Sequence, residues 1–561
     1  MKQLVVDRTL ASRFNVLMSI LFISHCYSFL AGGVAYGSIG ASPSLGEMVP
    51  DKMIYVNNQH PDASDSSKGD RTDSPVKTIG NAAKMAMRNQ EKGFSTKIII
   101  YPGTYREQIK LNFRNRKQSP PIVFEAKEKG TVIVSGSDVW TDWEELGETN
   151  VYVHPWPKKW GFMPGPSQLT QKYGPIVRRR EMIFVDHKPM NQVLSFDDLK
   201  KDTFYVSEEE SKVYLSPTSK LHLPDAIVEV AIRSDIFEIT RGQNVVVRGI
   251  TFQHDTTGMS TLGGAVHFIH SNNILIEDCK IVWNNWFGLR FTEVNNVTTR
   301  RNRENHNGGA GWVGWKIKDL LSEGDETSYN NWRGVSGNFL GWEIAGVKHH
   351  AVHDAIYRNY KAIGNQTRGF WLDYDNERIQ IEEACICDNL VDGINLEASQ
   401  GPIRIKDSRV CNNRNYGINA GNSSNITLEG NQLYGNNKSQ IALNITPVRM
   451  VENWQTGARE NVRGVNWILK RNSVSAALSS FLVDLPGDEQ FLNSLLLQEN
   501  VWSKEANTNL FRIGGKQVDL VEWQHLAGRN PRSTLTPAFQ QNTRNALGCE
   551  ANGSESRAIS K

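Results

Sequence analysis

The chain has 561 residues, of which 39% are hydrophobic and 22% charged, and it contains 46 glycines and 15 tryptophans. This composition is typical of a folded protein rich in turns and excludes a disordered chain. The formal net charge of +3 falls by two without the basic N-terminus described below, so charge gives no case for nucleic-acid or membrane partners.

Residues 1–35 predict a secretory signal peptide. Basic residues precede an apolar stretch from Val16 to Phe29, and small residues follow from Ala31 to Ala35. We expect cleavage near Ala35 or Ala41 and a secreted or periplasmic protein. Because no later apolar run is long enough to span a bilayer, we expect no membrane contact after the signal is removed.

Residues 51–149 predict an N-terminal cap followed by the first coils of a stack of strands. From Met53 the order is a strand, a polar loop rich in Asp, Ser and Gly, a short helix, and a strand ending in Pro-Gly-Thr-Tyr. A helix or loop over the first coil would cover an exposed strand edge. Residues 150–240 hold several aromatics, including Trp156 and Trp160, and do not follow the repeat described next, so we interpret them as a β-rich insertion.

Three segments between residues 378 and 436 align with almost no gaps: RIQIEEACICDN, PIRIKDSRVCNN and NITLEGNQLYGN. Each alternates apolar with polar residues, as a half-buried strand requires. Asparagines at 365, 389 and 413 are spaced 24 residues apart, glycines at 369, 393 and 417 repeat that interval, and Asn436 follows after 23. A period in the twenties indicates a solenoid, and turns rich in Asn and Gly without a leucine consensus favour a parallel β-helix over leucine-rich repeats.

Further motifs carry a resemblance to a family. NNWRG begins at Asn330, GWEIAGVK ends at Lys348, GFWLDYDN begins at Gly369, and VEWQHLAGRNPRS lies near the C-terminus. Together with the opening coil they resemble secreted bacterial right-handed parallel β-helix proteins of the pectate-lyase-like kind, which are usually assigned to carbohydrate breakdown. The resemblance implies an all-β solenoid with three short strands per coil and a polysaccharide as partner, but it implies no catalytic assignment.

We therefore expect a right-handed parallel β-helix with about 24 residues per coil. The predicted core covers residues 241–445, with a loop insertion at 308–346, and residues 446–561 form C-terminal coils and a tail. Five cysteines follow the signal peptide, and this odd number argues against a fold that depends on disulfides. Cys385 and Cys387 lack further ligands at the spacing of a metal site. We expect a monomer.

The repeat predicts which side chains share an outer surface, because residues one period apart stack about 4.8 Å from each other. Alternation places Phe370, Leu372, Ile394, Leu396, Ile418 and Ala420 inside. The opposite parity is predicted to face solvent: Trp371, Asp373 and Asp375 on one coil, Asn395, Glu397 and Ser399 on the next, and Asn419 and Gly421 on the third.

This outer set offers two carboxylate pairs. Asp373 and Glu397 are 24 residues apart and should lie roughly 5 Å apart, close to the separation in retaining glycosidases, whereas Asp375 and Glu397 form a diagonal of about 8 Å, within the inverting range. Either pair can divide acid and base roles, because neighbouring like charges separate the two pKa values. Trp371, Asn395 and Asn419 would contact a sugar. Like charges stacked in register destabilise a sheet unless a cation or a shared proton compensates them.

A lyase is the second interpretation of the same surface. Asp373, Asp375 and Glu397 would hold calcium, Lys348 would be the base and Arg368 the acid. Apart from this option we expect no cofactor.

The predicted insertion at 308–346 precedes this surface, and long excursions from a solenoid often form its binding site. Glu326, Asn330, Trp332, Arg333 and the following His349 are predicted to bind substrate. His349, His350 and His353 lack two partners at firm spacing, so we expect no transition metal there. His254 and Asp255 are interpreted as surface residues at a coil edge.

Three functions follow from these residues. The first is a glycoside hydrolase that uses two of Asp373, Asp375 and Glu397. The second is a calcium-dependent lyase for uronate-containing glycans, and the third is a carbohydrate-binding or adhesin-like protein without catalysis.

Overall fold

The computed structural model of the protein describes residues 39–41, 43–114, 119–163, 173–221, 225–260, 262–445, 448–476, 480–504, 511–526, 534–537 and 549. The predicted signal peptide lies outside these residues. Contacts divide the chain after Ile39, and the description below concerns the unit Gly40–Lys561. Within the described residues, no helix is both long and apolar enough to cross a membrane.

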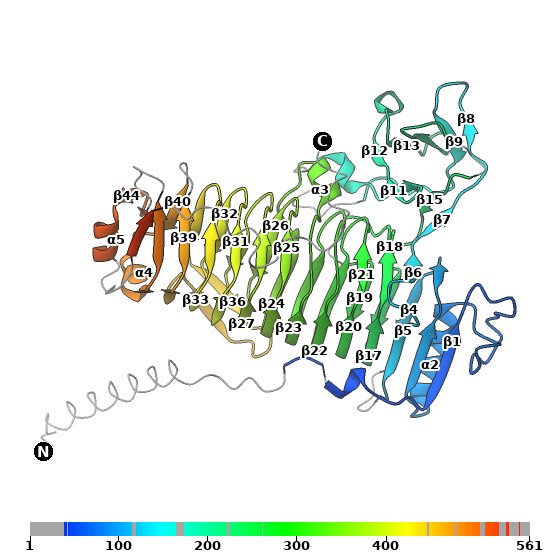
Figure 1. The fold of residues 1–561 in the computed structure, drawn as a ribbon, viewed down its shortest axis with the longest axis horizontal. Helices are drawn as coiled ribbons and strands as arrows, with labels where there is room; N and C mark the ends of the chain where they lie inside the picture. The colour runs from blue at the N-terminus through cyan, green and yellow to red at the C-terminus, as the bar shows by residue number, and fades with distance from the viewer. Residues whose placement is uncertain are drawn as a thin grey trace, which may run out of the picture. The chain divides into compact units, whose positions relative to one another are not determined.

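Parallel strands wind into a β-helix with three faces, and each coil adds one strand to a face (Figure 1). Face 1 consists of β4 (Ile109–Asn112), β16 (Phe237–Thr240), β19 (Val266–Ile269), the first parts of β22 (Leu289–Arg300), β23 (Trp312–Glu323) and β24 (Ala345–Arg358), β26 (Arg368–Asp373), β29 (Ile394–Glu397), β32 (Tyr416–Gly421), β35 (Ser439–Asn444), β40 (Phe481–Leu485) and β43 (Phe511–Ile513).

Face 2 follows face 1 in each coil. It consists of β1 (Lys52–Val56), β2 (Thr96–Ile100), β5 (Ile122–Ala126), β17 (Gln243–Arg248), β20 (Asn272–Glu277), the second parts of β22, β23 and β24, β27 (Glu377–Glu382), β30 (Ile403–Lys406), β33 (Ile426–Glu429), β38 (Trp467–Lys470) and β41 (Leu496–Gln498).

Face 3 completes the coil with shorter strands. It consists of β3 (Gly103–Tyr105), β6 (Val132–Ser135), β18 (Ile250–Gln253), β21 (Lys280–Val282), single bridges at Arg303 and Glu326, β25 (Lys361–Ile363), β28 (Cys385–Cys387), β31 (Arg409–Cys411), β34 (Gln432–Tyr434), β39 (Ser473–Ala476), β42 (Val501–Lys504) and β45 (Thr534–Pro537). The predicted all-β parallel β-helix is confirmed.

The repeated asparagines form a hydrogen-bonded ladder inside the turn from face 3 to face 1. The backbone N and the Nδ2 of Asn365 both donate to Oδ1 of Asn389. The same two groups of Asn389 donate to Oδ1 of Asn413, and those of Asn413 donate to Oδ1 of Asn436. Asn284, Asn307 and Asn330 extend the ladder upstream. Because buried amides must find partners, each coil must place its asparagine above the previous one, which fixes the register.

A helix follows the first strand of the stack, and an inserted module follows β6. In α2 (Ile79–Glu91) the buried residues, among them Ile79 and Ala83, pack into the hydrophobic core, and Figure 1 shows the helix beside β1. The module is built from β7 (Ser137–Val139), β8 (Glu144–Glu145), β9 (Tyr152–Pro155), β10 (Ile183–Val185), β11 (Lys188–Pro189), β12 (Asn191–Val193), β13 (Thr203–Ser207), β14 (Lys212–Ser216) and β15 (Val228–Ala231), and it has a core of its own around Trp156.

The remaining elements are η1 (Pro43–Gly46), η2 (Pro175–Arg178), η3 (Phe196–Asp198), α3 (Trp332–Ser336), the hairpin β36 (Arg449–Glu452) and β37 (Arg459–Val462), α4 (Glu489–Ser494), β44 (Lys516–Val518) and α5 (Leu520–Leu526). Within the predicted insertion at 308–346, β23 is a regular strand of faces 1 and 2. Trp312 pairs with Val347, a coil of 35 residues, whereas Leu289 pairs with Trp312 after 23. The added residues therefore lie after β23, around α3.

Two disulfides are present among the described residues, although the odd cysteine count argued against a fold that depends on them. Cys387 and Cys411 are in register on β28 and β31 and form one bond, with Cα atoms 4.6 Å apart. Cys385 bonds to Cys549, with a Cα separation of 5.7 Å. The odd cysteine is Cys279, which is free and buried.

Candidate functional site

The outward residues of face 1 on β24, β26 and β29 form a cluster of charges around Trp371. Nζ of Lys348 lies 3.6 Å from the centroid of the Trp371 ring, and the guanidinium of Arg368 lies 4.6 Å from it. Lys348 also lies 2.9 Å from a carboxylate oxygen of Asp373 and is only 2% exposed. The aromatic ring and the carboxylate therefore hold a buried lysine in one position.

Asp373 and Glu397 occupy neighbouring rungs of this surface, as predicted. The two residues pair in register between β26 and β29, and each carboxylate has its own cation. Lys348 forms an ion pair with Asp373, and Nη1 of Arg449 donates to Glu397 Oε1 over 2.7 Å. The like charges predicted to stack are thus compensated by basic neighbours, one from an adjacent coil and one from β36.

A pocket of about 270 Å³ opens beside Glu397. Its lining consists of Arg368, Asn395, Glu397, Asn419, Ala420, Gly421, Asn444 and Arg449. Nδ2 of Asn419 donates to Oδ1 of Asn395 over 3.1 Å. Oδ1 of Asn419 and Nη1 of Arg368 are buried and make no hydrogen bond within the described residues. The pocket therefore presents a carboxylate, two cations and amide groups suited to hydroxyl recognition.

Asp392 and Arg449 belong to this site, although the sequence interpretation did not include them. Burial raises the pKa of the Asp392 carboxyl, and the nearby charge of Arg368 opposes this shift. Asp392 lies 3.3 Å from Arg368 Nε and accepts a hydrogen bond from Asn419. An acidic residue directly before Gly393 was the available signal for Asp392. Arg449 had none, because it lies outside the repeat.

Asp375 does not lie on this surface, contrary to the prediction. It follows β26 with a φ of 58°, which turns the chain and ends the alternation, and its side chain is fully buried. Its carboxylate accepts hydrogen bonds from Gln400 and from the backbone N of Trp454. Ser399 is likewise buried in the turn. The predicted inverting pair and the predicted calcium ligands are therefore not brought together.

Asp375 belongs to a second cluster of titratable side chains. Ligand atoms of His353, Asp375 and Glu377 lie within 4.8 Å of one another, which gives His353 the two carboxylate neighbours that its sequence context did not reveal. His353 Nε2 is 3.2 Å from Asp375 Oδ1, and Nδ1 faces Oε1 of Gln455 at 2.9 Å. Burial lowers the pKa of His353, but these hydrogen bonds and the adjacent carboxylates outweigh burial, so the net shift is upward. A protonated imidazole satisfies both oxygens.

Four residues predicted to bind substrate lie elsewhere. Asn330 belongs to the asparagine ladder, and Glu326 is buried and accepts from Asn305. His349 points into the core and bonds to the hydroxyl of Tyr357, because its position has inward parity on β24. Arg333 is buried and donates to Gln192 and to the carbonyl of Glu181, so it anchors the inserted module.

Trp332 also contacts the module, packing with Met182 and Phe184 while its indole donates to the carbonyl of His306. The same junction buries His254, which stacks on Phe184 with ring centroids 3.7 Å apart. Asp255 is fully buried, and burial raises its pKa to about 7. The interpretation of His254 and Asp255 as surface residues is wrong, because the module covers this coil edge.

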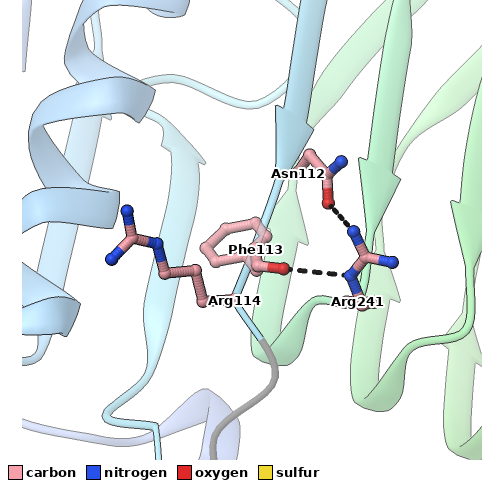
Figure 2. A pocket seen from close by; sticks show the side chains of 4 residues that line it. All are labelled: Asn112, Phe113, Arg114 and Arg241. Carbon is pink, nitrogen blue, oxygen red and sulfur yellow. Dashed lines mark hydrogen bonds between the residues drawn. The ribbon is translucent and has the colours of Figure 1, made fainter.

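A larger pocket of about 550 Å³ lies near the start of face 1 (Figure 2). Its lining is Asn112, Phe113, Arg114 and Arg241, and Figure 2 shows Arg241 turned toward Asn112. Arg241 donates to Asn112 Oδ1 over 2.7 Å and to the carbonyl of Phe113 over 3.2 Å. These lining residues supply no carboxylate for acid or base catalysis, whereas the pocket beside Glu397 supplies one.

Comparison with known proteins agrees with the fold. Residues 235–433 match the family model of the right handed beta helix region. The structure of XylC in complex with xylose is similar over 86% of each chain, with 16% identity and a TM-score of 0.64. A structure named glycoside hydrolase covers 85% of this chain and 98% of its own at 12% identity and a TM-score of 0.48.

The A-module of the Azotobacter vinelandii mannuronan C-5 epimerase AlgE6 covers 87% of this chain and 100% of its own, with 12% identity and a TM-score of 0.46. No curated protein sequence matches the chain. The strand pairing of the described residues, the family model and the XylC structure define a right-handed parallel β-helix protein, and at 16% identity the similarity to XylC concerns the fold alone.

Proposed function

We propose that the protein is a carbohydrate-active enzyme that hydrolyses glycosidic bonds on face 1. The observation that carries the proposal is the in-register pair Asp373 and Glu397, each with its own cation, beside Trp371 and a polar pocket. A similar fold binds xylose in XylC. In keeping with the N-terminal sequence, the enzyme would act outside the cytoplasm.

The contacts support a division of roles between the two carboxylates. Lys348 is buried and fixed against Asp373, which suits an ionised nucleophile. Glu397 lines the pocket and suits the acid that protonates the glycosidic oxygen. Neighbouring rungs are about 4.8 Å apart, close to the ~5–5.5 Å of retaining glycosidases. Asp373 would attack the anomeric carbon as the leaving sugar departs with the proton from Glu397. Glu397 would then deprotonate a water that cleaves the glycosyl-enzyme bond, which frees the sugar and Asp373.

The same contacts disfavour the lyase. A lyase base must reach the proton beside the sugar carboxylate. Lys348 is committed to Asp373 and covered by Trp371, and Asp375 is turned away from the surface where calcium would be needed. Lys348 therefore suits the positioning of Asp373 better than proton abstraction.

Incubation with a panel of polysaccharides and mass analysis of the products tests the proposal. We expect saturated products whose summed mass exceeds that of the substrate by one water for each bond cleaved. NMR should show that the anomeric configuration is retained. Glu397→Gln and Asp373→Asn should each lower kcat by about 10³-fold or more. Glu382→Gln is the control, because Glu382 lies on face 2 and pairs with Arg358. Unsaturated ends would overturn hydrolysis, and binding without any product would overturn catalysis.

A further inference from the structure

The segment 448–463, called the arm below, interrupts the coil between β35 and β38. Between Asp373 and Glu377 the chain turns from face 1 to face 2 within a few residues, but here it first forms the antiparallel hairpin β36–β37. Val451 and Val462 are buried and pack against Ala398 and Tyr374. The arm therefore folds back over earlier coils and covers the edge between faces 1 and 2.

Polar contacts hold the arm along this edge. The backbone N of Glu452 donates to the hydroxyl of Tyr374 over 2.8 Å, and that of Trp454 donates to Asp375 over 2.9 Å. Farther along, Asn453 donates to Glu377 over 2.6 Å, and Gln455 meets His353. These partners belong to coils that precede the arm by as many as four turns, and they explain why Asp375 is buried.

The base of the arm carries Arg449 to the pocket. Its guanidinium bonds to Glu397 over 2.7 Å and lies 5.9 Å from the Tyr374 ring, while 41% of the side chain stays exposed. Arg449 thus reaches Glu397 only because the arm is docked. Arg459, the other arginine of the hairpin, pairs with Glu452 on the exposed side.

We propose that the arm is part of the substrate site and that Arg449 is a positioning residue for Glu397. The inference rests on the proposed hydrolysis. When Glu397 gives its proton to the glycosidic oxygen it becomes a carboxylate, and the adjacent guanidinium stabilises that charge. The docked arm therefore sets the orientation of Glu397 at the pocket.

The test compares Arg449→Met with Arg459→Met in the full chain. In Arg449→Met the carboxylate that forms on Glu397 in the transition state loses its guanidinium partner. kcat should therefore fall about tenfold, since one charge-assisted contact is lost, and KM should change less. Arg449→Lys, which keeps the positive charge, should restore part of kcat, and Arg459→Met should match the unmodified protein.

Tyr374→Phe with Gln455→Ala supplies a second, independent test, because it weakens docking without altering Arg449. This double variant should also lower kcat more than it changes KM, and hydrogen exchange should show faster exchange confined to the arm. An unchanged kcat in Arg449→Met, with Glu397→Gln inactive, would overturn this inference and leave the proposed hydrolysis standing. An active Glu397→Gln would instead overturn the proposed hydrolysis.

Discussion

The regular coils between Arg368 and Tyr434 and the arm contribute to the same pocket, yet different interactions hold them in place. Each regular coil is fixed by a buried apolar row and by an asparagine bonded to the next coil. The arm is fixed by a small apolar contact and by single polar contacts to several coils. The comparison indicates that periodic burial determines register, whereas individual contacts determine which side chains complete the site.

The largest stability effect is expected from the ladder. Asn389→Ala removes the acceptor of two Asn365 N–H groups and the donor to Asn413 in a fully buried site. The free energy of unfolding should fall by about 4 kcal/mol, because buried donors are left without partners. Urea unfolding measures the loss, with the exposed Asn461→Ala of the arm as control. Equal effects of the two substitutions would remove the distinction between the regions.

The next effect is expected from the disulfide that joins two regular coils. Cys387 and Cys411 close a loop with a sequence separation of 24. Replacing both with serine should lower the free energy of unfolding by about 3 kcal/mol, since the crosslink restricts the unfolded chain. Thermal unfolding of oxidised and reduced samples provides the measurement. Identical midpoints before and after reduction would show that register alone holds these coils.

A smaller effect is expected where the inserted module contacts the stack. Arg333→Met removes the buried hydrogen bonds to Gln192 and to the Glu181 carbonyl. The free energy that stabilises the contact between the module and the stack should fall by about 2 kcal/mol, because the Glu181 carbonyl and the Gln192 amide lose a charged donor. Limited proteolysis of the module should accelerate, while the exposed Lys188→Met should leave it unchanged. Unchanged cleavage in Arg333→Met would assign the docking to other contacts.

The smallest effect is a pH dependence confined to the arm. Burial opposes protonation of His353, but Asp375 and Gln455 raise its pKa overall, and burial beside Glu377 and Asp375 raises the pKa of Glu460 on the arm. Both groups bind protons more tightly when the arm is docked, so docking is strongest below their ordinary pKa values and weakens as pH rises through the docked values. Lys318 and Arg378 are the nearby cations.

Hydrogen exchange of residues 448–463 as a function of pH measures this dependence, after correction for intrinsic rates. Protection should fall as pH rises, and His353→Gln should flatten the curve. Protection that increases with pH would contradict the sign. The ladder, which contains no titratable group, is the internal control.

The repeat by itself determined the parallel β-helix, its inward residues and the pairing of Asp373 with Glu397. This was possible because a residue one period away must lie on the neighbouring rung wherever a buried row fixes the register. Phe370, Ile394 and Ile418 are fully buried as predicted, whereas Trp371, which was predicted to face solvent, is only 7% exposed because Lys348 and Arg368 lie against its ring.

Only the tertiary structure decided where the periodicity ends. Asp375 follows a turn with positive φ, so its parity no longer predicts its direction, and His349 has inward parity on a longer strand. Arg449 reaches Glu397 across 52 residues of sequence, and Cys549 reaches Cys385 across 164. Such contacts have no local signal, because they depend on how an excursion folds back over coils that are already formed.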